Sequence, residues 1–257
     1  DAGFRLDQID RTGSVTDEDH GDIDNYSIDD TTNSFALSLG RDLSDTLDVN
    51  FGFASVERLP SVIELFMNGP HNATGRFEVG DPTLQSETSS NFDITLNYEK
   101  DGFYAYASFY VTDIDNYIAL IDEEDDHDDH DHGNLIHANY MQEDAEFNGY
   151  EFEIGRTFDL GMGELKASFG RDVVNAEFSD GHFVPRINPA RNIYSLSYKQ
   201  NDVVFKLNFK DVDKQRDIGE GETVTKGYRM LDTRITKTFN LRDNNELRVS
   251  IFGNNLL

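Results

Sequence analysis

The segment 122–132 reads Asp-Glu-Glu-Asp-Asp-His-Asp-Asp-His-Asp-His, so every side chain in it is a carboxylate or an imidazole. Carboxylate oxygen and imidazole nitrogen are the donors that Zn²⁺ and its first-row neighbours accept in proteins. Acidic runs without histidine are usually solvated surface, whereas short histidine-rich tracts are typical of metal binding. The segment therefore predicts metal capture, and a solvated acidic loop is the alternative.

The predicted ligands are the three histidines of this segment, and the aspartates between them are expected to act as local anionic partners. These residues are His127, His130, His132, Asp126, Asp128, Asp129 and Asp131. Their spacing does not define a rigid tetrahedral site, so we expect a flexible collector with several donors. The donor types allow zinc but do not select it, because Cu²⁺ binds the same donors more tightly. Ca²⁺ would leave the histidines unexplained.

Three further histidines are candidate ligands. His137 follows the acidic segment, and His71 lies in the sequence Gly-Pro-His-Asn-Ala-Thr. His20 stands among Asp17, Glu18, Asp19 and Asp22, a smaller version of the same composition. For each of them, and for His182 near Asp180, the alternative is an ordinary surface histidine.

The bulk composition excludes several classes of function. Twenty-two Lys and Arg against 50 Asp and Glu give a formal charge of −28, which repels nucleic acid and attracts cations. The chain has no cysteine, so disulfides and thiolate metal sites are excluded. No supported nucleophile–base arrangement, phosphate-binding glycine loop or HExxH motif is present, so we expect no enzyme. The N-terminal residues read as the interior of a strand, and we expect a piece of a longer protein.

Apolar and polar residues alternate along most of the chain, which is typical of β-strands with two different faces. Clear runs lie at 34–39, 47–53, 91–98, 103–112, 151–154, 164–169, 203–210 and 246–251, and weaker ones near 2–11, 191–199 and 228–239. These runs predict about eleven strands. The segment Ser61 to Met67, after Pro60, is the one short helix candidate.

Short and long connections alternate along the predicted strands. Short turns are expected near 41–46, 99–102, 159–163, 200–202 and 240–245, and long connections at about 13–29, 58–86, 113–145, 172–190 and 211–227. An antiparallel transmembrane β-barrel has short turns at one rim and long loops at the other. A soluble β-sandwich rarely places long loops at every second link. The barrel is favoured, with the acidic segment inside the 113–145 loop.

In such a barrel the apolar row of each strand faces lipid and the polar row faces a wet lumen. Lys206, Asn208 and Lys210 lie on one face of a predicted strand, which suits a lumen better than a sandwich core. The tyrosines 104, 106 and 110 have two interpretations: they line the lumen, or some belong to an aromatic girdle at the membrane interface.

Several motifs resemble those of TonB-dependent outer-membrane receptors. They are Arg58-Leu59-Pro60-Ser61 with Glu64-Leu65-Phe66, Phe77-Glu78-Val79-Gly80-Asp81-Pro82, Phe147-Asn148-Gly149-Tyr150-Glu151, Pro185-Arg186-Ile187-Asn188-Pro189-Ala190-Arg191, Gly227-Tyr228 with Leu231-Asp232, and Phe252-Gly253-Asn254-Asn255-Leu256-Leu257. Each motif is weak alone, but together they follow the family order from about residue 35 to 257.

Within that family, the acidic histidine loop and His71 look most like the zinc-uptake receptors, the ZnuD type. The resemblance implies half of a 22-stranded monomeric barrel in the Gram-negative outer membrane, with the 113–145 loop outside the cell. It also implies zinc as the transported ligand and the TonB complex as the energy source. A plug domain and the first barrel half would belong to the parent protein, since this sequence of residues 1–257 contains neither.

Two alternative functions follow from the sequence. The first is a receptor of the same fold for haem or a metal chelate, with His71 or His137 as an axial ligand. The second belongs to another class: a soluble acidic β-domain that buffers metal.

Overall fold

The computed structural model describes residues 1–16, 23–123, 135–242 and 245–257, which form thirteen β-strands and one short helix. The long strands are β1 (Ala2–Thr16), β2 (Ile23–Ser44), β3 (Leu47–Arg58), β6 (Glu87–Lys100), β7 (Phe103–Asp122), β8 (Ile136–Asp159), β9 (Glu164–Phe178), β10 (Arg191–Gln200), β11 (Val203–Val212), β12 (Tyr228–Asn240) and β13 (Glu246–Gly253). Helix α1 (Val62–Phe66) and strands β4 (Asn68–His71) and β5 (Arg76–Val79) lie between β3 and β6.

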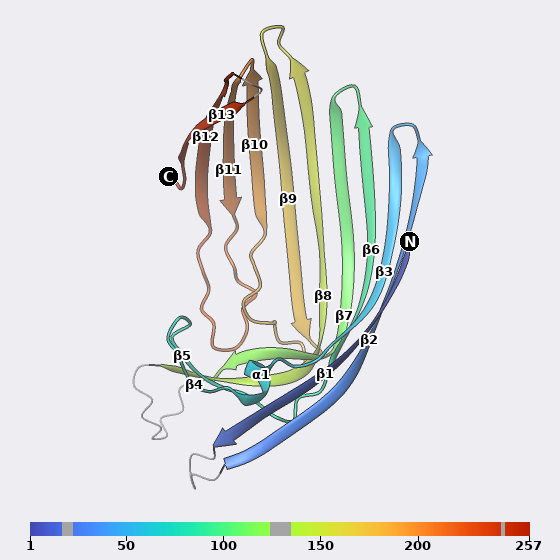
Figure 1. Cartoon of the computed structure of the whole chain (residues 1–257), viewed down its shortest axis with the longest axis vertical. Helices are drawn as coiled ribbons and strands as arrows, with labels where there is room; N and C mark the ends of the chain where they lie inside the picture. Colours follow the sequence, from blue (N-terminus) through green and yellow to red (C-terminus); the bar gives the residue numbers. More distant parts are fainter. Residues whose placement is uncertain (17–22, 124–134, 243–244) are drawn as a thin grey trace.

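The eleven long strands form an antiparallel meander in which each strand pairs with the next one in the order β1-β2-β3-β6-β7-β8-β9-β10-β11-β12-β13. Figure 1 shows this sheet curving like a partly closed cylinder, with β1 and β13 at its two edges. The predicted all-β antiparallel fold and its count of long strands are confirmed. No helix in the described residues is long and apolar enough to cross a membrane.

All the short turns lie at one end of the sheet, and the longer connections, with α1 and the β4–β5 hairpin, lie at the other (Figure 1). The turn between β6 and β7 is the tightest kind of hairpin. Asp101 and Gly102 both have positive φ, 50° and 76°, as a two-residue turn with the twist of its flanking strands requires. The predicted alternation of short and long connections is therefore confirmed.

The strands extend further into the long connections than the sequence pattern indicated. β7 runs to Asp122 and β8 begins at Ile136, so both continue through much of the predicted 113–145 loop. Alternation fails there because β7 carries a continuous apolar run, residues 117–121, in which the adjacent Ile118 and Ala119 are both buried, so both faces of the strand are covered. The hairpin β7–β8 therefore carries the acidic segment at its tip.

The register separates an apolar face from a polar one, as predicted. Phe51 lies opposite Ile94, and Ile94 lies opposite Phe109, so the three share a face. Phe51 and Phe109 are 51% and 50% exposed, which is unusual for large apolar side chains in a water-soluble sheet. This face is called the outward face below.

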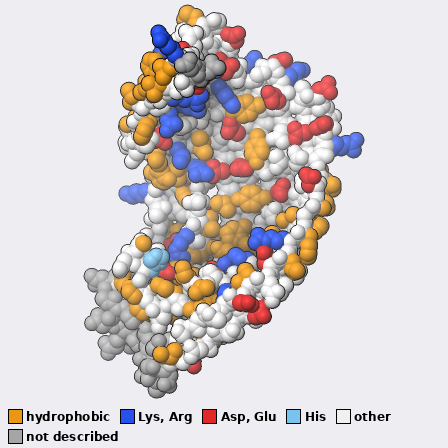
Figure 2. Space-filling model, viewed as in Figure 1, with side chains coloured by type: hydrophobic (Ala, Val, Ile, Leu, Met, Phe, Trp, Pro, Cys, Tyr) orange, Lys and Arg blue, Asp and Glu red, His pale blue; other side chains and the backbone are white. Residues whose placement is uncertain are grey.

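The other face, called the inward face, is polar. Lys206 lies opposite Ser197 and Arg234, and Ser195 donates a hydrogen bond to Asn208 over 2.9 Å. Figure 2 shows a hollowed face that carries Lys, Arg, Asp and Glu side chains between its hydrophobic ones. The polar row therefore suits a wet lumen.

Tyr104, Tyr106 and Tyr110, for which the sequence left two interpretations, belong to the inward face. Tyr106 donates to Glu151 over 2.7 Å, and Tyr104 donates to Glu153. Tyr110 lies directly opposite Gly149, where a Cβ would come within 2.5 Å of the tyrosine hydroxyl oxygen. The glycine thus makes room for the ring, and the lumen interpretation of these tyrosines is confirmed.

Candidate metal-capture site

The site begins with a short hairpin that folds back from the connection between β3 and β6. Helix α1 starts this segment with a capping box, in which the Ser61 hydroxyl accepts from the Glu64 backbone and the Glu64 carboxylate accepts from the Ser61 backbone. Strands β4 and β5 follow, and β5 pairs in parallel with β8. The hairpin is therefore fixed to the strand that leaves the acidic segment.

His71 at the end of β4 is paired with a buried carboxylate. Its Nδ1 lies 2.8 Å from Oε1 of Glu78, whose side chain is 2% exposed, while the histidine side chain is 47% exposed. A neutral imidazole that donates from Nδ1 carries its lone pair on Nε2. This carboxylate–histidine arrangement is the one that orients metal-ligating imidazoles.

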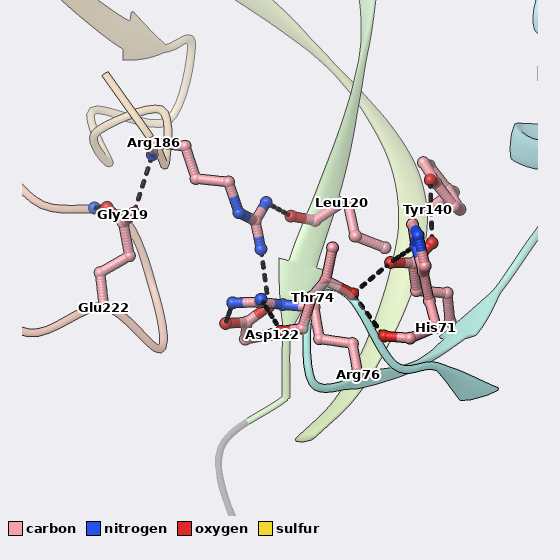
Figure 3. Close-up of polar contacts among 10 residues, drawn as sticks. His71, Thr74, Arg76, Leu120, Asp122, Tyr140, Arg186, Gly219 and Glu222 are labelled. Atoms are coloured by element: carbon pink, nitrogen blue, oxygen red, sulfur yellow. Dashed lines mark hydrogen bonds and ion pairs between the residues drawn. The ribbon is translucent and has the colours of Figure 1, made fainter. Parts of the chain in front are cut away.

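Two hydroxyl groups complete the surroundings of Glu78. Thr74 donates to Oε1 over 2.9 Å and Tyr140 of β8 donates to Oε2 over 3.3 Å. Burial, together with the neighbouring carboxylate of Glu78, raises the pKa of Tyr140 to about 12, so its phenol stays protonated and can only donate to an anion. These contacts keep Glu78 an acceptor and fix the ring of His71 (Figure 3).

The last residue of β7, Asp122, is held by two arginines. Arg76 donates from Nε to Oδ1 over 2.7 Å and from Nη2 to Oδ2 over 2.5 Å, and Arg186 donates from Nη2 to Oδ1 over 2.7 Å. The Asp122 side chain is 5% exposed. Figure 3 shows both guanidinium groups converging on this carboxylate from different segments of the chain. Asp122 opens the acidic run, yet its side chain serves as an anchor.

The anchor also links the later connections. The backbone N–H of Arg186 donates to Oε1 of Glu222 over 2.8 Å, and the N–H of Gly219 donates to Oε2 over 2.9 Å. The connections 179–190 and 213–227 are thereby tied to the strand that enters the acidic segment. Because Arg76 is also the register partner of His71, the histidine hairpin belongs to the same network.

His137 and His71 lie on opposite faces of the small sheet formed by β4, β5 and β8. His137 is the parallel partner of Phe77, whereas His71 is the partner of Arg76, and neighbouring residues of a strand point to opposite faces. The His137 ring stacks on Phe77 at 5.7 Å, and its Nδ1 lies 2.9 Å from Oε2 of Glu123. The two histidines therefore contact different carboxylates, Glu78 for His71 and Glu123 for His137.

The other predicted ligands lie outside the described residues: His20, Asp126, His127, Asp128, Asp129, His130, Asp131 and His132. Within residues 1–16, 23–123, 135–242 and 245–257, no three histidine or carboxylate side chains are arranged to hold a metal ion. The metal-ligand assignment therefore stays a prediction. His182 is placed beside Asp180, with its Nδ1 2.5 Å from Oδ2, and is largely exposed.

Sequence reasoning missed the partners that hold these residues. Glu78 had a weak signal, since an acidic residue between Phe77 and Val79 of a short apolar run needs a buried partner. Arg76 and Arg186 had none, because their common target Asp122 lies 46 and 64 residues away.

A family model described as "TonB dependent receptor-like, beta-barrel" matches residues 1–256. The chain belongs to this family. The predicted family and fold are therefore confirmed, whereas the match does not establish the zinc-uptake type.

Solved structures share the fold of this receptor barrel. The copper transporter OprC superposes with a TM-score of 0.79 at 21% identity, covering 99% of this chain and 39% of that one. The ferric yersiniabactin uptake receptor FyuA from Yersinia pestis has a TM-score of 0.68 at 15% identity, covering 99% and 37%. The FrpB iron transporter from Neisseria meningitidis has a TM-score of 0.63 at 15% identity, covering 99% and 38%. The chain thus spans less than two fifths of these proteins.

Proposed function

We propose that this chain is the part of an outer-membrane receptor that captures a divalent transition metal for import with TonB-supplied energy. Zinc is the first candidate for this metal. The observation that carries the proposal is the position of the acidic histidine segment. It connects β7 to β8 at the end of the sheet where the long connections lie, and its first residue is tied through Arg76 to the hairpin of His71. External metal would reach this end of the barrel first.

The chemistry of the donors supports a cation as cargo. The segment 123–132 adds seven carboxylates and three imidazoles, and the whole chain carries a charge of −28. Such a field concentrates cations at the mouth, and the imidazoles favour zinc or copper over calcium. Ions would then pass to inward carboxylates such as Glu151 and Glu153.

The test is labelled-zinc accumulation in zinc-starved cells that carry the full-length receptor. Deleting residues 124–134 keeps Asp122 and Glu123, so the described anchor is preserved while the histidines are lost. We expect uptake to fall, with excess zinc restoring it, and His182→Asn, outside the proposed donor set, to behave like wild type. Uptake that never depends on the receptor would contradict the proposal.

A pH series gives a second check on the histidines. Imidazole must be neutral to ligate a metal, so affinity is expected to fall below about pH 6. Binding unchanged between about pH 7.5 and about pH 5.5 would remove the histidines from the site.

A ferric chelate or haem is the second candidate, because two of the similar structures are named for ferric chelate or iron uptake. A Soret shift on adding haem that disappears in His71→Ala would favour it. The soluble metal buffer is not supported, since the chain belongs to a membrane-barrel family and exposes apolar side chains along its outward face.

A further inference from the structure

Four cationic side chains lie on the outward face near the short turns. Arg41 is opposite Val49, Lys100 and Arg156 are opposite Phe103, and Lys237 is opposite Val249. Directly opposed residues share a face, so these cations project on the same side as the exposed apolar row. All four are exposed.

Their positions along the strands follow a regular pattern. Arg41, Arg156 and Lys237 each stand three residues before the last residue of β2, β8 and β12, and Lys100 is the last residue of β6. The four therefore form a belt at one end of the sheet, on four different hairpins. We call them the basic belt.

No strand carboxylate accompanies the basic belt on the outward face beside the short turns. In the five strand residues on each side of every short turn, the carboxylates all face inward: Asp42, Asp48, Glu99, Asp159, Glu164 and Glu246. The chain has 50 acidic residues against 22 basic ones, so a wholly cationic outward border departs sharply from its composition.

The opposite border of the outward face has the reverse sign. Asp113 lies opposite Glu146, and Glu146 lies opposite Glu177, on the same face as Val111. Arg229, an outward cation at that border, lies opposite Asp211 and is paired with it. The face thus carries only cations beside the short turns and a net negative charge beside the long connections. A general basic character of the outward face does not explain this asymmetry.

Aromatic rings fix the level of two belt cations. The guanidinium carbon of Arg156 lies 5.4 Å from the ring centroid of Phe158, and Nζ of Lys237 lies 5.6 Å from that of Phe239. Aromatic side chains mark the membrane interfaces of barrels, where long cationic side chains extend toward the headgroups. The charges are therefore expected at the depth of the lipid phosphates.

We propose that the basic belt binds the phosphate groups of anionic phospholipids in the periplasmic leaflet. This inference rests on the proposed function, because it requires the barrel to span the outer membrane with its short turns at the periplasmic side. Each cation near an anionic lipid surface contributes roughly a fivefold preference. The belt would fix the depth and the lipid neighbours of the barrel.

The experiment uses the full-length receptor in a neutral detergent, incubated with an equimolar mixture of phosphatidylglycerol and phosphatidylcholine. Native mass spectrometry then counts the bound lipids of each kind. Wild type is expected to retain phosphatidylglycerol preferentially, and the triple variant Arg41→Gln, Arg156→Gln, Lys237→Gln to lose most of that preference, by tenfold or more. The preference should also weaken as salt is added.

The matched control removes three inward cations near the same end: Lys166→Gln, Lys206→Gln and Arg248→Gln. It makes the same change in net charge and is expected to keep the wild-type lipid preference. Heat-dependent gel mobility reports folding, and if the triple variant does not fold, the single variants Arg156→Gln and Lys237→Gln should each lose roughly fivefold.

The proposal would be contradicted if wild type and the belt variant had the same preference for phosphatidylglycerol, or if the control variant lost as much of that preference as the belt variant. The proposed function fails by different readouts, namely absence of the receptor from the outer-membrane fraction or zinc accumulation that ignores the receptor. Belt variants that reach the membrane are expected to accumulate zinc like wild type.

Discussion

Nδ1 of His71 lies 2.8 Å from Oε1 of Glu78, so a half-exposed imidazole is oriented by a carboxylate that is almost fully buried. Glu78 itself is fixed by Thr74 and Tyr140. The energetic cost of burying this carboxylate is offset by three donors, and the arrangement leaves Nε2 of His71 as the atom available to a ligand. A surface histidine with no role needs no such support.

The first prediction concerns this pair. Glu78→Gln keeps a hydrogen-bond acceptor for His71 but removes the carboxylate charge beside the imidazole. We expect zinc affinity of the full-length receptor to fall by about tenfold to a hundredfold. Competition with a chromophoric chelator would measure it. Glu99→Gln, which removes a carboxylate near a short turn, is the control and should change affinity little.

A double-mutant cycle separates this role from bulk charge. If Glu78 acts through His71, Glu78→Gln has no further effect in a His71→Ala background. An undiminished effect in that background would show that Glu78 attracts the cation directly and does not orient the histidine.

The second prediction concerns the anchor of the acidic segment. Asp122→Ala leaves Arg76 and Arg186 facing each other without their shared carboxylate. Removing one partner of a buried pair costs about 3–5 kcal/mol, and the lower figure applies here because Arg186 is 39% exposed. Hydrogen exchange of the peptide around residues 118–123 should accelerate by about a hundredfold.

The matched variant is Asp211→Ala, which breaks the ion pair of Asp211 with Arg229. The Asp211 side chain is 37% exposed and the Arg229 side chain is 68% exposed. Exposed pairs contribute at most about 1 kcal/mol, so local exchange there should change only slightly. Similar effects of both variants would mean that the anchor has no special stabilising role.

The sequence predicted what depends on local periodicity. In 47–53 and 91–98 the alternation showed both the strand and its outward face, because one lipid-facing side must stay apolar over the whole span. The β4–β5 hairpin was missed. Its strands have four residues each, too few for a period of two to appear, and its parallel pairing with β8 is a long-range contact.

The site was predicted by composition and not by geometry. His71 was chosen from its motif, but its partner Glu78 follows from the fold of the hairpin, which places positions 71 and 78 on one face. His137 was chosen by its nearness to the acidic run, and the register puts it on the other face beside Phe77. Proximity along the chain does not determine which face a strand residue takes.

The third prediction concerns pH and the exposed pair His182–Asp180. The hydrogen bond and charge of Asp180 raise the pKa of His182 above its ordinary value of 6.5, and the backbone and side chain of His182 lower the pKa of Asp180. The stabilising contribution of His182 to the free energy of unfolding is therefore complete below pH 6.5 and is lost as pH rises through its raised pKa. The contribution of Asp180 is lost as pH falls through its lowered pKa.

Nuclear magnetic resonance of the receptor labelled at histidine would follow this titration. We expect His182 to titrate above 6.5 and Asp180→Asn to return it to the ordinary value. An unchanged midpoint in Asp180→Asn would show that the two side chains do not pair in solution.

The last prediction tests the assignment of the two faces with adjacent residues. Phe92 is 56% exposed on the outward face, eight residues from Lys100 of the basic belt, and its neighbour Asn91 points inward, where its amide donates to Asp93 over 3.3 Å. A lysine on the lipid face near the bilayer midplane destabilises a barrel by about 2–4 kcal/mol, whereas a lumen lysine meets water. Phe92→Lys should therefore unfold at lower denaturant than wild type, and Asn91→Lys should stay close to it, since Asp93 offers the new cation a partner. Denaturant titration of the receptor in lipid vesicles measures both losses, and equal losses in the two variants would mean that the exposed apolar row does not face hydrocarbon.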